Sequence, residues 1–115
     1  MAEDAELDQR RERAARNESL FRAVNERIED LAGNASFSLF ICECMNQNCD
    51  EAVSVTLEEY EHVRSGPNRF IVLRGHEIPE VDAVVETCDR YLVVEKRGTG
   101  RRVAEELDPR AHRHR

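Results

Sequence analysis

Apolar residues in the first third of the chain recur with a helical period. No proline or glycine interrupts residues 3–32. Within this stretch, spacings of three and four that sum to seven place one set of apolar side chains on a single helical face. Its members are Leu7, Ala14, Phe21, Val24, Ile28 and Leu31. We therefore predict a long amphipathic helix that Gly33 and Asn34 end.

The two halves of this predicted helix differ in apolar content. From residue 21 to residue 31 the apolar stripe is continuous, whereas Arg10 and Asn17 interrupt it earlier. We expect firm docking only after about Asn17, and the stripe has to be covered by the domain itself, by a partner protein or by a second copy. In a homodimer, Asn17 at the seam would fix the register. The predicted partner surface consists of Phe21, Val24, Ile28 and Leu31.

The remainder of the chain shows short strand patterns. Runs rich in β-forming residues are bounded by turn residues, which is typical of strands. The predicted strands cover residues 37–44, 52–56, 70–73 and 91–94. The first two flank a cysteine-rich loop, so we expect that loop to be the turn of a hairpin.

Two short helices are predicted between these strands. Thr56-Leu57-Glu58-Glu59 matches a capping box, and Ser65-Gly66-Pro67 ends the segment that it opens. The second helix is predicted over residues 79–88, where Val81, Val84, Val85 and Cys88 have helical spacing.

These elements predict an α+β fold with a long N-terminal amphipathic helix and a small, zinc-stabilised antiparallel sheet with two short helices. The predicted organisation has three parts. Residues 1–34 form a helix for docking or coiled-coil formation, residues 35–97 form a zinc-binding α+β domain, and residues 98–115 form a flexible basic tail.

The predicted zinc site rests on three cysteines in eight residues. Cys42, Cys44 and Cys49 form a CxCxxxxC motif. In a strand, residues two apart share a face, so the first two thiols can reach one ion, and a turn with two asparagines, which tolerate left-handed backbone angles, returns the third. A tetrahedral Zn²⁺ ion needs closely spaced sulfurs and one more sulfur or nitrogen.

His76 is the favoured fourth ligand. It follows a predicted strand in a Gly-His-Glu loop, where Gly75 gives the backbone freedom to bring an imidazole to the sulfurs. Cys88 is the alternative, although its place on a valine stripe suits a buried apolar residue. Three cysteines and a histidine would fill the coordination shell, which favours a structural ion over a catalytic one.

Composition and charge narrow the function further. The 115 residues are 40% hydrophobic and 36% charged, with no tryptophan, so the core is modest and a metal crosslink would add to it. The acidic opening residues resemble neither a signal peptide nor a membrane span, and we expect a cytoplasmic protein without membrane contact. In that reducing compartment clustered cysteines hold metal more often than disulfides.

Charge is unevenly distributed along the chain. The net charge of −7 arises from −3 in residues 1–32, −8 in residues 42–95 and +4 in residues 96–115. An acidic body repels phosphate backbones, so nucleic acid is at most a secondary ligand of the basic tail.

Other candidate chemistry is weak. We interpret the following groups as solvated faces or a loose tail: Glu58, Glu59 and Glu61; Arg10, Arg11, Arg13 and Arg16 with the interleaved Glu12 and Glu18; His62; and His112 with His114. The Gly98-Thr99-Gly100 run lacks the third glycine of a phosphate loop. No catalytic set is predicted, so we expect a protein that is not an enzyme.

The stretch from Phe37 to Lys96 resembles small proteins of an actinobacterial type. The resemblance is carried by the CxCxxxxC motif, the Thr-Leu-Glu-Glu-Tyr-Glu-x-Val-Arg helix, the Gly-His-Glu loop and the Tyr-Leu-Val-Val-Glu-Lys strand. It implies a defined family and transfers no activity. The motif differs from that of zinc-binding anti-sigma proteins, in which a histidine is followed by CxxC on helices.

The leading functional hypothesis is a non-catalytic intracellular zinc-binding adaptor or regulator that acts through protein contacts, with a partner protein or with itself, at the N-terminal helix. Two alternatives stay open. One is a transcription- or ribosome-associated factor that touches nucleic acid through its basic tail. The other is a thiol-based switch that releases zinc on oxidation.

Overall fold

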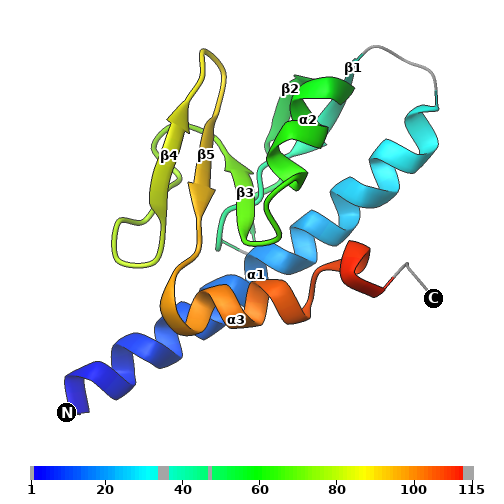
Figure 1. Ribbon diagram of the computed structural model, residues 1–115. Helices are drawn as coiled ribbons and strands as arrows, with labels where there is room; N and C mark the ends of the chain where they lie inside the picture. Colours follow the sequence, from blue (N-terminus) through cyan, green and yellow to red (C-terminus); the bar gives the residue numbers. More distant parts are fainter. Residues whose placement is uncertain (1, 34–36, 47, 113–115) are drawn as a thin grey trace.

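The computed structural model describes residues 2–33, 37–46 and 48–112. It is an α+β fold, as predicted, in which two small antiparallel sheets lie on one side of a long helix (Figure 1). The elements in chain order are α1 (Ala2–Ala32), β1 (Phe37–Ile41), β2 (Ala52–Thr56), α2 (Leu57–Arg64), β3 (Arg69–Val72), β4 (Ala83–Thr87), β5 (Leu92–Glu95), α3 (Gly98–Glu106) and a short 3₁₀ helix, η1 (Pro109–His112).

The two sheets share one apolar core. β1 pairs with β2, and β5 lies between β3 and β4. Phe40 of β1 and Phe70 of β3 are fully buried in this core, and the Phe40 ring stacks on Tyr60 of α2 at 4.4 Å between centroids. Beyond β1 the chain crosses to the second sheet, where the Glu43 N–H donates to the Ile71 carbonyl at 2.7 Å.

The first short helix begins and ends as predicted. The Thr56 hydroxyl accepts the Glu59 N–H at 3.0 Å, and the Glu59 carboxylate accepts the Thr56 N–H at 2.8 Å, which completes the capping box. At the other end Ser65 is the C-cap residue. Likewise Gly33 follows α1 with a φ of 60°, the left-handed value that favours glycine after a helix.

The predicted helix over residues 79–88 was wrong, because the segment contains β4. A bulge between Val84 and Glu86 shifts the pairing with β5 by one residue, and the extra residue makes a strand mimic helical spacing. Val84 is exposed and Val81 lies in the preceding turn, so the four apolar residues do not share one face.

The predicted flexible tail was also wrong for residues 98–112. α3 packs across the first half of α1 (Figure 1) and buries Val103 and Ala104. Gly100 permits this crossing, since a Cβ atom there would lie 3.2 Å from the Arg11 carbonyl oxygen. A short segment with only two large apolar residues gives a weak helical pattern, and here the tertiary contact with α1 compensates.

The expectation that α1 docks only after Asn17 was also wrong, because the first half of the helix packs against the fold as well. Ala14 and Ala15 are fully buried in the first half of the helix. Asn17 itself donates to the Met45 carbonyl at 3.2 Å, so it faces the cysteine loop and not a dimer seam.

From Glu18 to Glu26 the buried face of α1 is polar rather than apolar. Its residues Glu18, Arg22, Asn25 and Glu26 are at most 2% exposed. Arg22 donates to the carbonyl oxygens of Pro67 at 2.6 Å and Ala104 at 2.7 Å. It also lies over the Phe70 ring at 4.5 Å, as in a cation–π contact.

The predicted apolar partner surface is therefore divided. Ile28 packs against the core and Phe21 is partly buried, whereas Val24 and Leu31 are 47% and 74% exposed. A helix can turn a polar face inward when each buried charge finds a partner, and a hydrophobic pattern alone does not report that.

Two groups of buried ions join α1 to the rest of the fold. Lys96, at the end of β5, contacts the carboxylates of Glu18 and Asp82, and burial raises the pKa of Glu18 well above its usual range. On the other side Arg64 and Arg110 both pair with Glu26. Each pairing connects segments far apart in sequence.

Candidate metal centre

The β1–β2 connection supplies three thiols. Cys42 continues the strand ladder, donating its N–H to the Glu51 carbonyl at 2.9 Å. Because side chains alternate along an extended chain, Cys42 and Cys44 point to one side and Glu43 to the other. All three cysteines are buried, with 0%, 2% and 7% exposure for Cys42, Cys44 and Cys49.

The turn that returns Cys49 is closed by an asparagine. The Asn46 carbonyl accepts the Cys49 N–H, and its side-chain oxygen accepts the Asn48 N–H, both at 3.0 Å. This is an Asx turn. We expected left-handed asparagines here, but among the described residues no non-glycine residue has a positive φ, and residue 47 lies outside the description. Asn46 acts through its side-chain hydrogen bond instead.

His76 reaches the thiols from the loop after β3. Its N–H donates to the Leu73 carbonyl at 2.9 Å, and Gly75 has a φ of 90°, as a turn with left-handed backbone at its third position requires. The Nδ1 atom then lies 3.5 Å from Cys42 Sγ and 3.6 Å from Cys49 Sγ.

The four candidate ligand atoms share one small volume. The sulfurs of Cys42, Cys44 and Cys49 and a ring nitrogen of His76 all lie within 4.8 Å of one another, and all four cysteines of the chain are free thiols. Bonds of about 2.3 Å to sulfur and 2.0 Å to nitrogen place tetrahedral zinc ligands roughly 3.5 to 3.8 Å apart. Cys88, the alternative ligand, is not in this group, so the geometry favours His76.

Neighbouring groups orient these ligands. The Glu51 carboxylate lies 3.1 Å from His76 Nε2, so the other ring nitrogen is left to face the sulfurs. The Leu73 N–H donates to Cys42 Sγ at 3.2 Å. Burial raises the pKa of the Cys42 and Cys44 thiols, so binding a cation here must displace protons.

Glu43 ties the centre to α1 and β3. Its fully buried carboxylate accepts from Asn25 Nδ2 at 2.8 Å and from the Ile71 N–H at 3.0 Å. Burial raises its pKa to about 7. Asn25 also bonds both the N–H and the carbonyl of Ile41 at 2.8 Å, which occupies the free edge of β1.

Sequence reasoning missed the orienting roles of Glu51 and Glu43. An acidic residue two positions after Cys49 was a visible signal for the first. For Glu43 the strand alternation could have indicated an inward-facing carboxylate, but only the structure shows which groups receive it.

The remaining candidate residues lie elsewhere. His62 is exposed and pairs with Glu86 at 2.7 Å, as expected of a solvated face. Glu59 and Glu61 pair with Arg90 and Arg110, respectively. Glu18 is buried instead of solvated, and His114 lies outside the described residues together with the side chain of His112.

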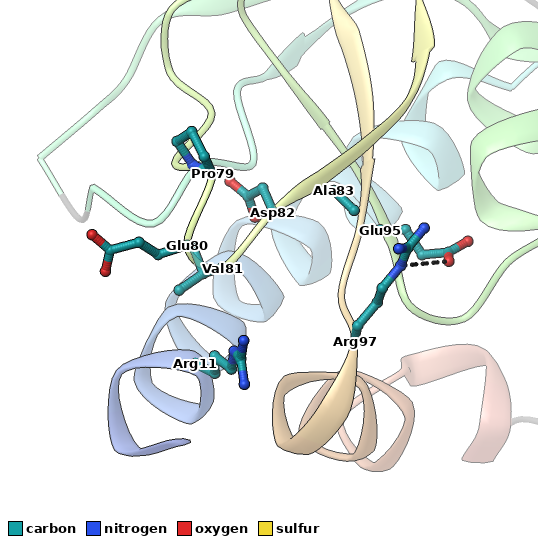
Figure 2. Close-up of a pocket in the computed structure, with 8 residues that line it drawn as sticks. All are labelled: Arg11, Pro79, Glu80, Val81, Asp82, Ala83, Glu95 and Arg97. Atoms are coloured by element: carbon teal, nitrogen blue, oxygen red, sulfur yellow. Dashed lines mark ion pairs between the residues drawn. The ribbon is translucent and has the colours of Figure 1, made fainter. Parts of the chain in front are cut away.

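A hollow of about 200 Å³ lies between α1, the turn before β4 and the end of β5. Figure 2 shows the residues that line it, which include the basic Arg11 and Arg97 and three acidic residues. Each carboxylate there has a cationic neighbour: Glu80 pairs with Arg10, Asp82 with Lys96, and Glu95 with Arg69 and Arg97. The hollow therefore presents balanced charge and no convergent ligand set.

A second hollow, of about 250 Å³, adjoins the metal centre. Cys44 and His76 line it together with Met45 and Ile78. One face of the cluster is thus reachable by a small molecule, although the sulfurs themselves are buried.

None of the helices in the described part of the chain combines the length and the apolar character of a membrane span. Comparisons with protein-family models, curated proteins and solved structures found no match to this chain. The resemblance to small actinobacterial-type proteins stays a prediction. The metal centre is consequently argued from its own geometry.

Proposed function

We propose that this protein binds one Zn²⁺ ion through Cys42, Cys44, Cys49 and His76. The observation that carries the proposal is the convergence of three sulfurs and one imidazole nitrogen within 4.8 Å. A set of three thiolates and an imidazole suits zinc, whereas hard cations such as Mg²⁺ and Ca²⁺ prefer oxygen ligands. The two loops that supply the ligands are positioned by backbone hydrogen bonds and a glycine turn, without a disulfide.

The proposed ion is structural. Four protein ligands complete a tetrahedron and leave no position for a water or a substrate. The ion would join the β1–β2 loop to the loop after β3, two segments that the Leu73–Cys42 hydrogen bond also links. In our proposal the ion has no catalytic role, the protein is not an enzyme, and the metal fixes the shape of a binding module.

The proposed role of this module is that of an adaptor or regulator acting through protein contacts. The exposed apolar residues Leu20, Val24 and Leu31 of α1 support it, because they lie on a helix that is already held in place from its other side. Nucleic-acid binding through the C-terminal segment has less support. Arg110 is engaged by Glu26, Glu29 and Glu61 and is not free to contact phosphate.

The test is the metal content of freshly purified protein measured by elemental analysis, with Cys44→Ser and Cys88→Ser as a matched pair. We expect one equivalent of zinc in the wild type and in Cys88→Ser, and none in Cys44→Ser. Substitution with Co²⁺ should give the visible absorption of a tetrahedral thiolate site. A full equivalent retained by Cys44→Ser, or wild-type protein that neither contains nor takes up zinc, would refute the assignment.

A redox-responsive version of the site is a second candidate, favoured by the hollow beside Cys44 and His76. Hydrogen peroxide entering there would oxidise two zinc-bound thiolates to a disulfide, be reduced to two water molecules with uptake of two protons, and release the ion. Zinc release at low peroxide, followed with a chromogenic chelator and reversed by a thiol reductant, would support this candidate. Retention of zinc under the same conditions would leave the purely structural role.

A further inference from the structure

The outer face of α1 carries an alternating basic and apolar pattern. Taking 100° per residue, one set of six residues lies within 40° of Leu20 on the helix, opposite the buried Glu18 and Arg22. Every member is exposed, and Leu20, Val24 and Leu31 are 62%, 47% and 74% exposed. We call this face the basic stripe, formed by Arg13, Arg16, Leu20, Val24, Arg27 and Leu31.

The spacings along the basic stripe are three, four, four, three and four, so it runs straight along about 27 Å of helix. Between residues 9 and 31 no acidic residue lies within 60° of its centre. Glu12 and Asp30 lie about 80° away on one flank, where Glu12 pairs with Arg16 at 3.9 Å, and Glu6 lies on the same face about 10 Å before Arg13. Three positive charges are thus grouped on one surface of a chain whose net charge is −7.

We propose that the basic stripe binds an acidic amphipathic helix of another protein. Such a helix would place its own leucine or isoleucine ridge against Leu20, Val24 and Leu31. Its Asp or Glu residues would meet Arg13, Arg16 and Arg27. The inference rests on the proposed adaptor function and names the class of its partner, and it does not depend on the identity of the metal.

A second copy of this chain fits the basic stripe poorly. In an antiparallel pair of α1 helices, Leu20 would face Val24 of the other copy, and this register brings Arg16 within one residue of Arg27. In a parallel pair each arginine would face its own counterpart. Both orientations bring like charges together along the seam, which disfavours self-association.

An anionic membrane fits less well than a helix. A helical partner contacts a strip about as wide as the basic stripe, whereas a lipid surface is flat and would also approach the acids on the flank. Three apolar side chains also bury little area in a bilayer. The charge pattern of the chain as a whole, which is acidic, opposes approach to anionic lipids.

The experiment uses zinc-loaded full-length protein and two synthetic helical peptides with identical leucine positions, one with glutamate and one with lysine beside them. Binding is measured by fluorescence anisotropy at physiological salt. We expect the glutamate peptide to bind at least about tenfold more tightly than the lysine peptide. Equal affinity for the two peptides, or binding of neither, would overturn the proposal.

Two matched pairs of variants locate the site. Arg16→Glu/Arg27→Glu should weaken the glutamate peptide at least about tenfold, whereas Arg97→Glu/Arg102→Glu, with the same change in net charge on exposed positions, should change it less than about twofold. Val24→Ser should weaken binding, whereas Val84→Ser, at an equally exposed valine of β4, should not. Equal effects within either pair would place binding elsewhere.

Further readouts separate the competing occupants and the two proposals. Concentration-dependent dimerisation in sedimentation that Val24→Ser abolishes, or tighter binding to phosphatidylserine vesicles than to the glutamate peptide, would overturn the inference. Zinc content and thermal unfolding of the basic-stripe variants should equal those of the wild type, which shows that lost peptide binding is not lost folding. Wild-type protein that neither contains nor takes up zinc, but binds the peptide through the basic stripe, would refute the metal assignment alone.

Discussion

Two neighbouring regions of the molecule are held together by opposite chemistry. In the first, the metal region, three thiols and an imidazole from two loops converge on a point suited to a single cation. In the second, the α1 region, α1 is joined to the rest of the fold by side chains that carry both signs of charge, such as Glu18 with Lys96 and Glu26 with Arg64. In our proposal the metal region needs an external ion, whereas the α1 region is complete without one.

This difference has an energetic consequence. The buried thiols with raised pKa values lie close together but do not attract one another. Much of the stability of the metal region therefore depends on the ion. A buried ion pair costs desolvation energy that its own attraction roughly offsets, so it contributes little net stability but penalises any arrangement that separates its members. The stability of the metal region therefore depends on the ion, whereas the buried ion pairs of the α1 region favour one arrangement of the chain over others.

Removal of the proposed zinc ion should have the largest effect. A strong chelator should lower the free energy of unfolding by several kcal/mol, since structural zinc contributes about 10 to 16 kcal/mol in small zinc-binding peptides. Amide hydrogen exchange should accelerate most at residues 37–56 and 73–78, while residues 92–106 keep measurable protection. If amide hydrogen exchange stays unchanged in both regions after complete metal removal, the thiols act only as packed apolar side chains and hold no structural ion.

Breaking the buried ion pairs of the α1 region should have the second largest effect. Lys96→Met leaves the carboxylates of Glu18 and Asp82 buried without their cation, and we expect a loss of about 3 to 5 kcal/mol in urea unfolding of the zinc-loaded protein. Adding Glu18→Gln should recover part of this loss. Arg101→Met, which removes an exposed pair with Glu105, is the control and should change stability by less than about 0.5 kcal/mol.

If Lys96→Met does not change the free energy of unfolding, the buried ions of the α1 region make no measurable contribution to stability. The contrast between the two regions then disappears. Zinc stoichiometry of this variant should stay at one equivalent, because Lys96 lies outside the metal centre.

A smaller effect is expected from the group that orients His76. Glu51→Gln should weaken zinc affinity about tenfold in a competition with a chelating dye, because the ring loses the carboxylate that fixes its tautomer. Asp50→Asn makes the same change in charge at the adjacent exposed residue and should leave the affinity nearly unchanged. Equal weakening by both variants would indicate a general electrostatic effect rather than ligand orientation.

The smallest effect is expected from a substitution at the start of α2, outside both the metal region and the α1 region. Thr56→Ala removes the side-chain half of the capping box of α2 and should cost about 1 kcal/mol of stability with no change in zinc affinity. Thr87→Ala, at the exposed end of β4, is the control. A change in zinc affinity with Thr56→Ala would mean that α2 transmits strain to the metal loop through β2.

The sequence alone determined those features whose signal is local. The capping box at Thr56, the glycine after α1, the strands that flank the cysteines and the grouping of Cys42, Cys44 and Cys49 all follow from residue types at fixed short spacings. His76 was the favoured fourth ligand because a glycine turn after a strand gives an imidazole room to reach across.

Only the tertiary structure decided which face of α1 is buried and what the residues after Lys96 do. Arg22, Asn25 and Glu26 are polar, so a hydrophobic pattern assigns them to solvent, yet their partners lie about 16 to 84 residues away in sequence. The bulge in β4 misled the pattern in the same way. Desolvation of a charge is compensated by a specific distant group, and no local spacing encodes that group.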